Sequence, residues 1–276
     1  NAGFRVRNQI MPVLLKDSKY AQRDVIGDLN IIKNFKYQTL RDYYHKWYRP
    51  DLQAIAVVGD FDVDQMEKKV KELFSKIPTP VNPAKRENFT VNPHDEIYFV
   101  CATDKELTQS SVSVYIKYPA PTKEEKNHQY MKNGILQSFY NTMLGQRVSE
   151  LLQKGNPPFI SAQAGFGGNI VRGWNTYIIS TTAKPNEEAG ALEAIYRENE
   201  RVKKFGFTET ELTDAKKLLL ASFDNLYKDK GKLSSGQIAA ELQSYFLENE
   251  PAPGLEYYYR FVQTVIPQIT VEEVSA

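Results

Sequence analysis

The sequence predicts an α+β protein in which helices pack on one face of a mainly antiparallel sheet. Residues 111–118 alternate between polar and apolar side chains, which is the pattern of a half-buried antiparallel strand. Two more strand-like segments, 159–166 and 175–182, are joined by a glycine-rich stretch, as in a hairpin with a bulge or a wide loop. Helical segments dominate from residue 186 onward. This order of strands first and helices later favours a helix layer over one sheet.

The first 80 residues are predicted to be mainly helical. Residues 30–35 form a short helical turn, and residues 37–48 form a helix that ends where a proline follows. The continuous apolar run 53–58 is predicted to be a buried strand. Asp62 then caps an amphipathic helix, and Gln65 completes a capping box. The apolar face of this helix consists of Val63, Met66, Val70, Leu73 and Phe74.

A proline-rich segment divides the chain. Residues 78–95 contain four prolines and two asparagine–proline steps, which are typical of a boundary. We therefore expect one part at 1–80, a linker at 81–95 and a second part at 96–276. The second part is predicted to open with a short strand at 97–102.

The second part is predicted to contain five helical stretches. Thr208 and Glu211 form a capping box at the start of one of them, and Gly206 ends the helix before it. Ser234 or Ser235 begins another, which ends before a proline. The predicted stretches are 124–152, 186–205, 208–228, 234–250 and 253–265. The stretch 124–152 is predicted to be one long helix or two abutting ones.

Composition excludes several classes of partner. Lysine and arginine number 35 against 34 aspartate and glutamate, so net charge gives no attraction to nucleic acid or to an anionic membrane. The longest aliphatic run, 54–58, is too short to span a bilayer. The single cysteine, Cys101, excludes an internal disulfide. Both ends, at Asn1 and within the helix start 270–273, have the character of cuts in a longer chain.

The sequence has no residues that assemble a zinc site. A hydrolytic zinc site needs about three protein ligands with one open position. The three histidines, His45, His94 and His128, have no second histidine at helical spacing. The run 94–96 (HDE) holds three possible ligands, but adjacent residues do not converge on one ion, so metal binding there is disfavoured. His45 is expected to pack or lie at the surface, and His128 to be solvated.

Other candidate sites favour structural explanations. The glycines of 165–168 precede a strand rather than a helix, so a turn is favoured over a phosphate-binding loop. The serines of 110–113 have no nearby histidine to activate them. Lys117, Tyr118 and Tyr177 could touch a substrate, but strand aromatics are more often core or cross-strand residues. No catalytic or metal-binding residue is assigned, and the substrate-binding residues are unknown.

Several segments resemble a known family. The segment 37–62 (YQTLRDYYHKWYRPDLQAIAVVGDFD) is similar to the helix–strand–helix unit of the pitrilysin/insulinase zinc peptidases, in which F-Y-x-x-x-Y-x-P recurs before V-x-G-D. The segment 19–27 (KYAQRDVIG) resembles the family's tyrosine–arginine–isoleucine–glycine stretch. The segment 205–212 (FGFTETEL), followed by 215–217 (AKK), resembles its G-x-T-x-x-E-L-x-x-A-K pattern. The prolines before Phe159 and the glycine at 165 are most similar to the bacterial branch.

The resemblance implies a zinc peptidase whose metal site lies elsewhere. Members use H-x-x-E-H, in which two histidines bind zinc and the glutamate acts as general base, and a further glutamate is the third ligand. Both elements precede the tyrosine–arginine stretch in the family, so they would lie upstream of Asn1. The resemblance thus makes 1–80 the C-terminal part of the metal-binding domain and 96–276 a second domain of the same fold without metal.

One family feature is altered in this chain. The second domain commonly offers an arginine and a tyrosine to the scissile carbonyl, in a pattern like L-R-x-x-x-x-x-x-Y. The corresponding stretch, 151–159 (LLQKGNPPF), has Leu152 at the arginine position and Phe159 at the tyrosine position. The change removes a cation and a hydroxyl donor that stabilise an oxyanion. Neither residue is therefore assigned that role.

The resulting hypothesis is a fragment of a zinc-dependent metalloendopeptidase that helps to form a substrate chamber. The alternatives are a non-catalytic scaffold or peptide-binding subunit of the same family, and an unrelated α+β peptide-binding module. Expected partners are a peptide substrate, bound by strand addition near 159–166, and the remaining domains of the parent. Zinc is expected in the parent and not in 1–276. Unpaired sheet edges, including the strand 53–58, predict a possible homodimer. The bacterial resemblance favours a periplasmic or exported location.

Overall fold

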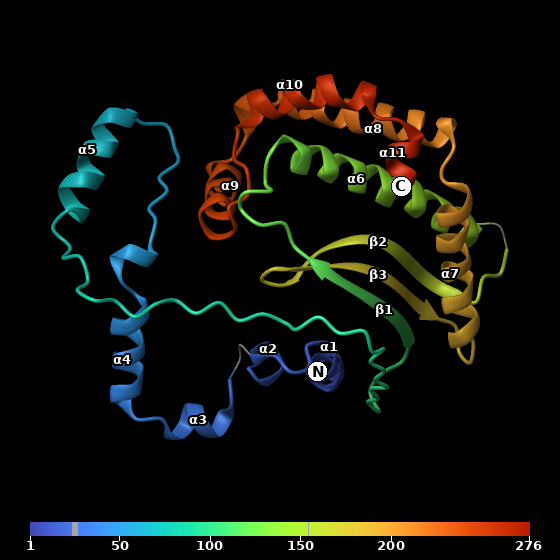
Figure 1. Ribbon diagram of the computed structural model, residues 1–276, viewed down its shortest axis with the longest axis horizontal. Helices are drawn as coiled ribbons and strands as arrows, with labels where there is room; N and C mark the ends of the chain where they lie inside the picture. Colours follow the sequence, from blue (N-terminus) through green and yellow to red (C-terminus); the bar gives the residue numbers. More distant parts are fainter. Residues whose placement is uncertain (24–26, 154) are drawn as a thin grey trace.

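A three-stranded antiparallel sheet lies at the centre of the computed structural model, which describes residues 1–23, 27–153 and 155–276 (Figure 1). Its strands are β1 (Ser110–Pro119), β2 (Phe159–Val171) and β3 (Trp174–Ala183), in the order β1-β3-β2. β3 is central because it pairs with both neighbours. β1 and β2 are therefore the edges of this sheet.

Helices cover one face of the sheet, which confirms the predicted fold class (Figure 1). The long helix α6 crosses β2 and α7 packs on β3, while α8, α10 and α11 form an outer row over α6. The core between these layers is apolar and includes Phe139, Leu144 and Ile195, all at most 1% exposed. The helices of this part are α6 (His128–Gln153), α7 (Glu188–Phe205), α8 (Glu209–Lys228), α9 (Ser235–Glu248), α10 (Leu255–Val265) and α11 (Val271–Ser275).

Local capping explains where the later helices begin and end. Thr208 and Glu211 form the predicted capping box of α8, in which each side chain bonds the other's backbone N–H. Ser234 caps α9, and Thr270 caps α11 with Glu273. Gly206 follows α7 with φ of +67°, a conformation that side chains rarely adopt. The segment 124–152, predicted as one long helix or two abutting ones, forms the single helix α6, which starts at His128 and not at 124.

β1 has the predicted alternation but is incompletely covered. Val114 and Ile116 lie opposite Ile179 and Tyr177 of β3, so they share the face that meets the helices. Val114 is nevertheless 37% exposed and Ile116 is 54% exposed. An edge strand lies at the rim of the helix layer, which explains the partial cover.

The glycine-rich segment is part of a strand, so its prediction as a turn is wrong. Residues 165–168 lie within β2, opposite Ile178 to Thr176 of β3. The turn of the hairpin lies at 172–173 instead, where Gly173 has φ of +82°. The pairing shifts register between Gly167 and Asn169, so the predicted bulge is present.

The N-terminal part is an extended arm. Its helices are α1 (Ala2–Leu14), α2 (Lys19–Gln22), α3 (Leu29–Asn34), α4 (Tyr37–Trp47) and α5 (Val63–Phe74), and a short 3-10 turn lies at Pro50–Leu52. Two further 3-10 turns, Lys230–Lys232 and Ile266–Gln268, lie in the C-terminal part. α1 and α2 lie under the sheet, while α3, α4 and α5 extend away from it (Figure 1). Lys117 of β1 donates from Nζ to the Leu14 carbonyl at 2.8 Å, which fixes α1 to the sheet.

Two predicted strands do not form. Residues 53–58 and 97–102 have no strand structure, and Ile97 and Phe99 are 96% and 86% exposed. A strand is stabilised by hydrogen bonds to a neighbour, and no neighbour is available to either segment in the described part of the chain. Asp62 does cap α5 as predicted, accepting from the Gln65 N–H at 2.9 Å.

None of the helices in the described ranges is both long and apolar enough to cross a membrane.

Candidate functional site

The hydrogen bonds of Asn141 show which main-chain groups of β2 point away from β3. Its Nδ2 donates to the Phe166 carbonyl at 2.9 Å, and its Oδ1 accepts from the Phe166 N–H at 2.8 Å. Both main-chain groups of Phe166 therefore point away from β3. The amide of Asn141 stands where a neighbouring strand would otherwise place its own backbone.

The same alternation exposes the rest of the β2 edge. Pairing with β3 is regular from Ser161 to Gly167, so Ala162 and Ala164 present their N–H and C=O groups in the same direction as Phe166. No described strand lies beyond β2. This edge can accept an extended peptide as an additional strand.

Gly165 makes room for the Asn141 contact. Its φ is +152°, and a Cβ at this position would lie 2.3 Å from Asn141 Oδ1. Only glycine fits there. Sequence reasoning missed Asn141, although a polar residue between the apolar helix positions Phe139 and Met143 was a usable signal.

Leu152 and Phe159 have different environments. Phe159 begins β2 and is 1% exposed within the apolar core, so its ring cannot reach a ligand. Leu152 lies near the end of α6 and is 38% exposed. The residue at 154, and residues 24–26 of the family-like stretch 19–27, lie outside the described residues.

The histidines take part in aromatic contacts and are not grouped. His94 stacks on Tyr98 with ring centroids 4.1 Å apart, and its Nδ1 lies 2.7 Å from the Glu96 carbonyl oxygen. His128 is exposed as predicted, but it also stacks on Tyr257 and Phe261. Within 1–23, 27–153 and 155–276, no three His, Cys, Asp or Glu side chains are placed to hold a metal ion. The described residues therefore do not fit a zinc site.

Of the other candidate side chains, Ser113 and Tyr177 have structural partners, whereas the buried Tyr118 hydroxyl has no hydrogen-bond partner among the described residues. Ser113 and Ser180 share a cross-strand hydrogen bond of 2.7 Å. The hydroxyl of Tyr177 donates to Asn199 of α7. The Tyr140 hydroxyl of α6 lies 3.0 Å from the Tyr177 hydroxyl oxygen. Burial raises the pKa of Tyr177, so this phenol stays protonated. The contacts of Tyr177 join the sheet to α6 and α7.

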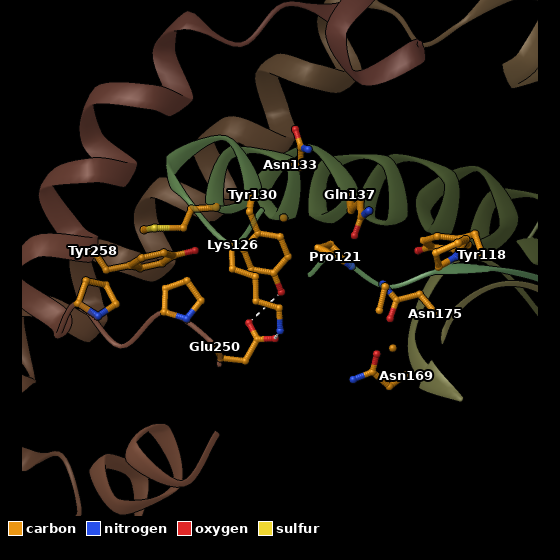
Figure 2. Close-up of a pocket in the computed structure, with 18 residues that line it drawn as sticks. Tyr118, Pro121, Lys126, Tyr130, Asn133, Gln137, Asn169, Asn175, Glu250 and Tyr258 are labelled. Carbon is orange, nitrogen blue, oxygen red and sulfur yellow. Dashed lines mark hydrogen bonds and ion pairs between the residues drawn. The ribbon is translucent and has the colours of Figure 1, made fainter. Parts of the chain in front are cut away.

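A cavity of about 540 Å³ lies at the end of the sheet where β1 stops (Figure 2). Its walls come from the end of β1 and the following loop 119–121, the first turns of α6, the β2–β3 hairpin and the segment 250–253. Figure 2 shows Tyr130 and Tyr258 on one side of the space, and Gln137, Asn169 and Asn175 on the other.

The charges beside this cavity neutralise each other. Lys126 forms an ion pair with Glu250 and donates to the Glu248 carbonyl at 2.8 Å. The Tyr130 hydroxyl donates to Glu250 at 2.8 Å. Burial and the neighbouring Glu250 carboxylate raise the pKa of Tyr130. These contacts hold the segment 250–253 against α6 and leave the cavity without an unpaired charge of its own.

Comparison with known proteins identifies the family. The family described as the peptidase M16 inactive domain matches residues 34–219. The chain belongs to the M16 peptidase family. The resemblance to the pitrilysin/insulinase zinc peptidases is thereby confirmed.

Relatives of this M16 chain include named zinc proteases. It is 26% identical over its full length to the zinc protease PQQL-like of Arabidopsis thaliana, and 23% identical to the probable zinc protease PqqL of Escherichia coli. It spans 26% and 29% of the lengths of these two relatives. A crystal structure of the first half of the periplasmic protease PqqL from Escherichia coli has the same fold, with a TM-score of 0.88 at 22% identity over all of this chain and 58% of that one.

Proposed function

We propose that this M16 chain is a non-catalytic part of a zinc-dependent metalloendopeptidase and that it binds peptide along the free edge of β2. The observation that carries the proposal is the row of main-chain groups at Ala162 and Ala164, which point away from β3 with no described strand beyond them. The family description as an inactive domain supports the absence of a catalytic role for this chain itself.

The proposed division of labour follows the two parts of the chain. Residues 1–80 would complete a metal-binding domain, 81–95 would be a linker, and 96–276 would form the second wall of a substrate chamber. Zinc, bound by residues outside 1–276, would polarise the scissile carbonyl and activate water. No step of hydrolysis is assigned to this chain, because its described residues hold no suitable ligand set.

A periplasmic location is part of the proposal. It is supported by the description of the Escherichia coli relative as a periplasmic protease.

A test of the β2 edge uses one position and two substitutions. Ala164→Pro removes an outward N–H while leaving the bonds to β3, and proline is tolerated on an edge strand. Ala164→Val adds bulk but keeps the N–H. We expect Ala164→Pro to weaken binding of an unstructured, fluorescently labelled casein peptide at least about fivefold, since a main-chain hydrogen bond is lost. Ala164→Val should bind like the unaltered chain. Equal binding by all three proteins would overturn the β2 proposal.

The catalytic part of the proposal is tested by metal analysis. We expect purified 1–276 to bind no stoichiometric zinc and to cleave no peptide, whereas a longer protein that contains it should do both and lose activity with a chelator. One zinc per 1–276 chain would contradict the proposal.

A longer protein without zinc would instead support a family scaffold that binds peptide without cleaving it. The replacement of the family's arginine and tyrosine by Leu152 and Phe159 favours this second candidate.

A further inference from the structure

The cavity at the end of β1 has two chemically different halves. Tyr130 and Tyr258 contribute rings to one half. Pro251 and Pro253 also line the cavity. The other half presents the amide side chains of Gln137, Asn169 and Asn175. A space of about 540 Å³ is large enough for a few amino-acid residues.

The amides of the second half are free to bind a ligand. Gln137, Asn169 and Asn175 form no side-chain hydrogen bond with any described residue, and Gln137 and Asn175 are half-buried. An amide supplies two N–H donors and one acceptor, so each can bond a carbonyl group. Half-buried amides without partners favour a ligand that satisfies them.

The proline-rich wall of the cavity, formed by 119–121 and 250–253, offers few main-chain donors. Pro119, Pro121, Pro251 and Pro253 line it and have no N–H. The N–H of Ala120 is already bonded to the Gly173 carbonyl at 2.9 Å. A ligand therefore cannot join this wall as an additional strand, and recognition at this wall must come from side chains.

We propose that this cavity binds an uncharged, proline-containing polypeptide segment in the polyproline II conformation. This helix forms no internal hydrogen bonds, so its carbonyls remain free to accept from Gln137, Asn169 and Asn175. Its proline rings pack on Tyr130 and Tyr258, since aromatic grooves recognise such segments. The ligand is uncharged because Lys126 and Glu250 are paired with each other.

The inference rests on the proposed function only in taking a polypeptide as the ligand. The cavity borders the end of β2 at 167–169, but it uses amide side chains and rings instead of the outward main chain of Ala162 and Ala164. The two proposals can therefore fail separately. Lys126 and Glu250 act as positioning residues that hold the 250–253 wall.

Calorimetric titration of the whole chain with acetylated, amidated hexaproline tests the inference. We expect saturable binding with a Kd below about 1 mM. A hexaalanine control should bind at least about tenfold more weakly, because a flexible chain loses more entropy on binding. Gln137→Leu and Asn169→Ala should each weaken hexaproline binding about fivefold or more. Gln163→Leu on β2 is the matched control and should leave it unchanged.

The outcomes separate the proposals. Absence of hexaproline binding, or equal binding of hexaalanine, would overturn the polyproline inference. Ala164→Pro should leave hexaproline binding unchanged while weakening binding of the casein peptide. Thermal unfolding monitored by circular dichroism checks that each variant is folded, and the exposed Asn169→Ala variant provides a second test if Gln137→Leu is destabilised.

Discussion

Gly165 shows how strongly a single position can be constrained by its neighbour. A Cβ there would lie 2.3 Å from Asn141 Oδ1, and the backbone has φ of +152°. We expect Gly165→Ala to lower the free energy of unfolding by about 1–3 kcal/mol, because either the backbone or the Asn141 amide must move. The midpoint of urea unfolding measures this change.

Gly168→Ala is the matched control for this substitution. Gly168 lies in the same strand, and a Cβ there would meet no described atom within 4 Å. We expect its unfolding midpoint to stay within experimental error of the original. Equal losses for the two variants would mean that the Asn141 contact does not constrain Gly165.

The ionisation of Glu211 is expected to make the free energy of unfolding depend on pH. Arg147 of α6 donates to both Glu211 oxygens, at 2.6 and 2.9 Å, and Glu211 also caps α8. The Arg147 hydrogen bonds are the largest cause that lowers the Glu211 pKa from 4.5 to about 2. A carboxyl whose pKa is lower in the folded state stabilises the protein above its unfolded pKa, and this stabilisation is lost as the pH falls.

We therefore expect Glu211→Gln to be less stable than the original protein at pH 7, by about 2 kcal/mol. The difference should shrink as the pH falls from about 4.5 towards about 2, where Glu211 itself becomes protonated. Urea unfolding across this pH range measures the effect. The control is Glu209→Gln, an exposed residue in the same first turn of α8. A difference between wild type and Glu211→Gln that did not change with pH would contradict this linkage.

At the scale of elements, the sequence specifies helix boundaries better than strands. Thr208, Ser234 and Thr270 each cap a helix, because a cap depends on residues within four positions of each other. The apolar runs 53–58 and 97–102 did not become strands. A strand needs a partner that the run itself does not specify, so its formation depends on residues far away in the chain.

The candidate sites depend on the same long-range information. Asn141 and Phe166 lie 25 positions apart in the sequence, and Lys126 and Glu250 lie 124 positions apart, so no local sequence pattern predicts either contact. The prediction of a peptide-binding edge near 159–166 was based only on the strand-like pattern of that segment. That β2 is an edge follows from β3 pairing between both neighbours, which became clear only in the folded chain.

Helices α4 and α5 are expected to be weakly protected from hydrogen exchange. Neither contains a buried residue, and Val63 and Leu73 of α5 are 70% and 67% exposed. Few buried contacts mean a low free energy of local opening. Hydrogen–deuterium exchange followed by mass spectrometry should show their amides exchanging well before those of α6 and β3. Equal protection of α5 and α6 would show that another surface covers α5 in solution.

At the scale of the whole molecule, the apolar core belongs to one part of the chain. All members of the main buried cluster lie between Ile135 and Val274. Before residue 96, the buried apolar side chains of the described residues are Leu15 and Val91. Because burial of apolar surface is the main driving force of folding, the two parts should differ greatly in independent stability.

Separate expression of 96–276 and 1–95 tests this conclusion and the proposed division of the chain. We expect 96–276 to unfold cooperatively, since it retains the sheet, the helix layer and the whole cluster. Its midpoint should fall below that of 1–276, because the bond from Lys117 to the Leu14 carbonyl and the cover that α1 gives the sheet are lost. Residues 1–95 should show no cooperative transition in calorimetry. A sharp transition in 1–95, or none in 96–276, would mean that the arm and the sheet form a single folding unit.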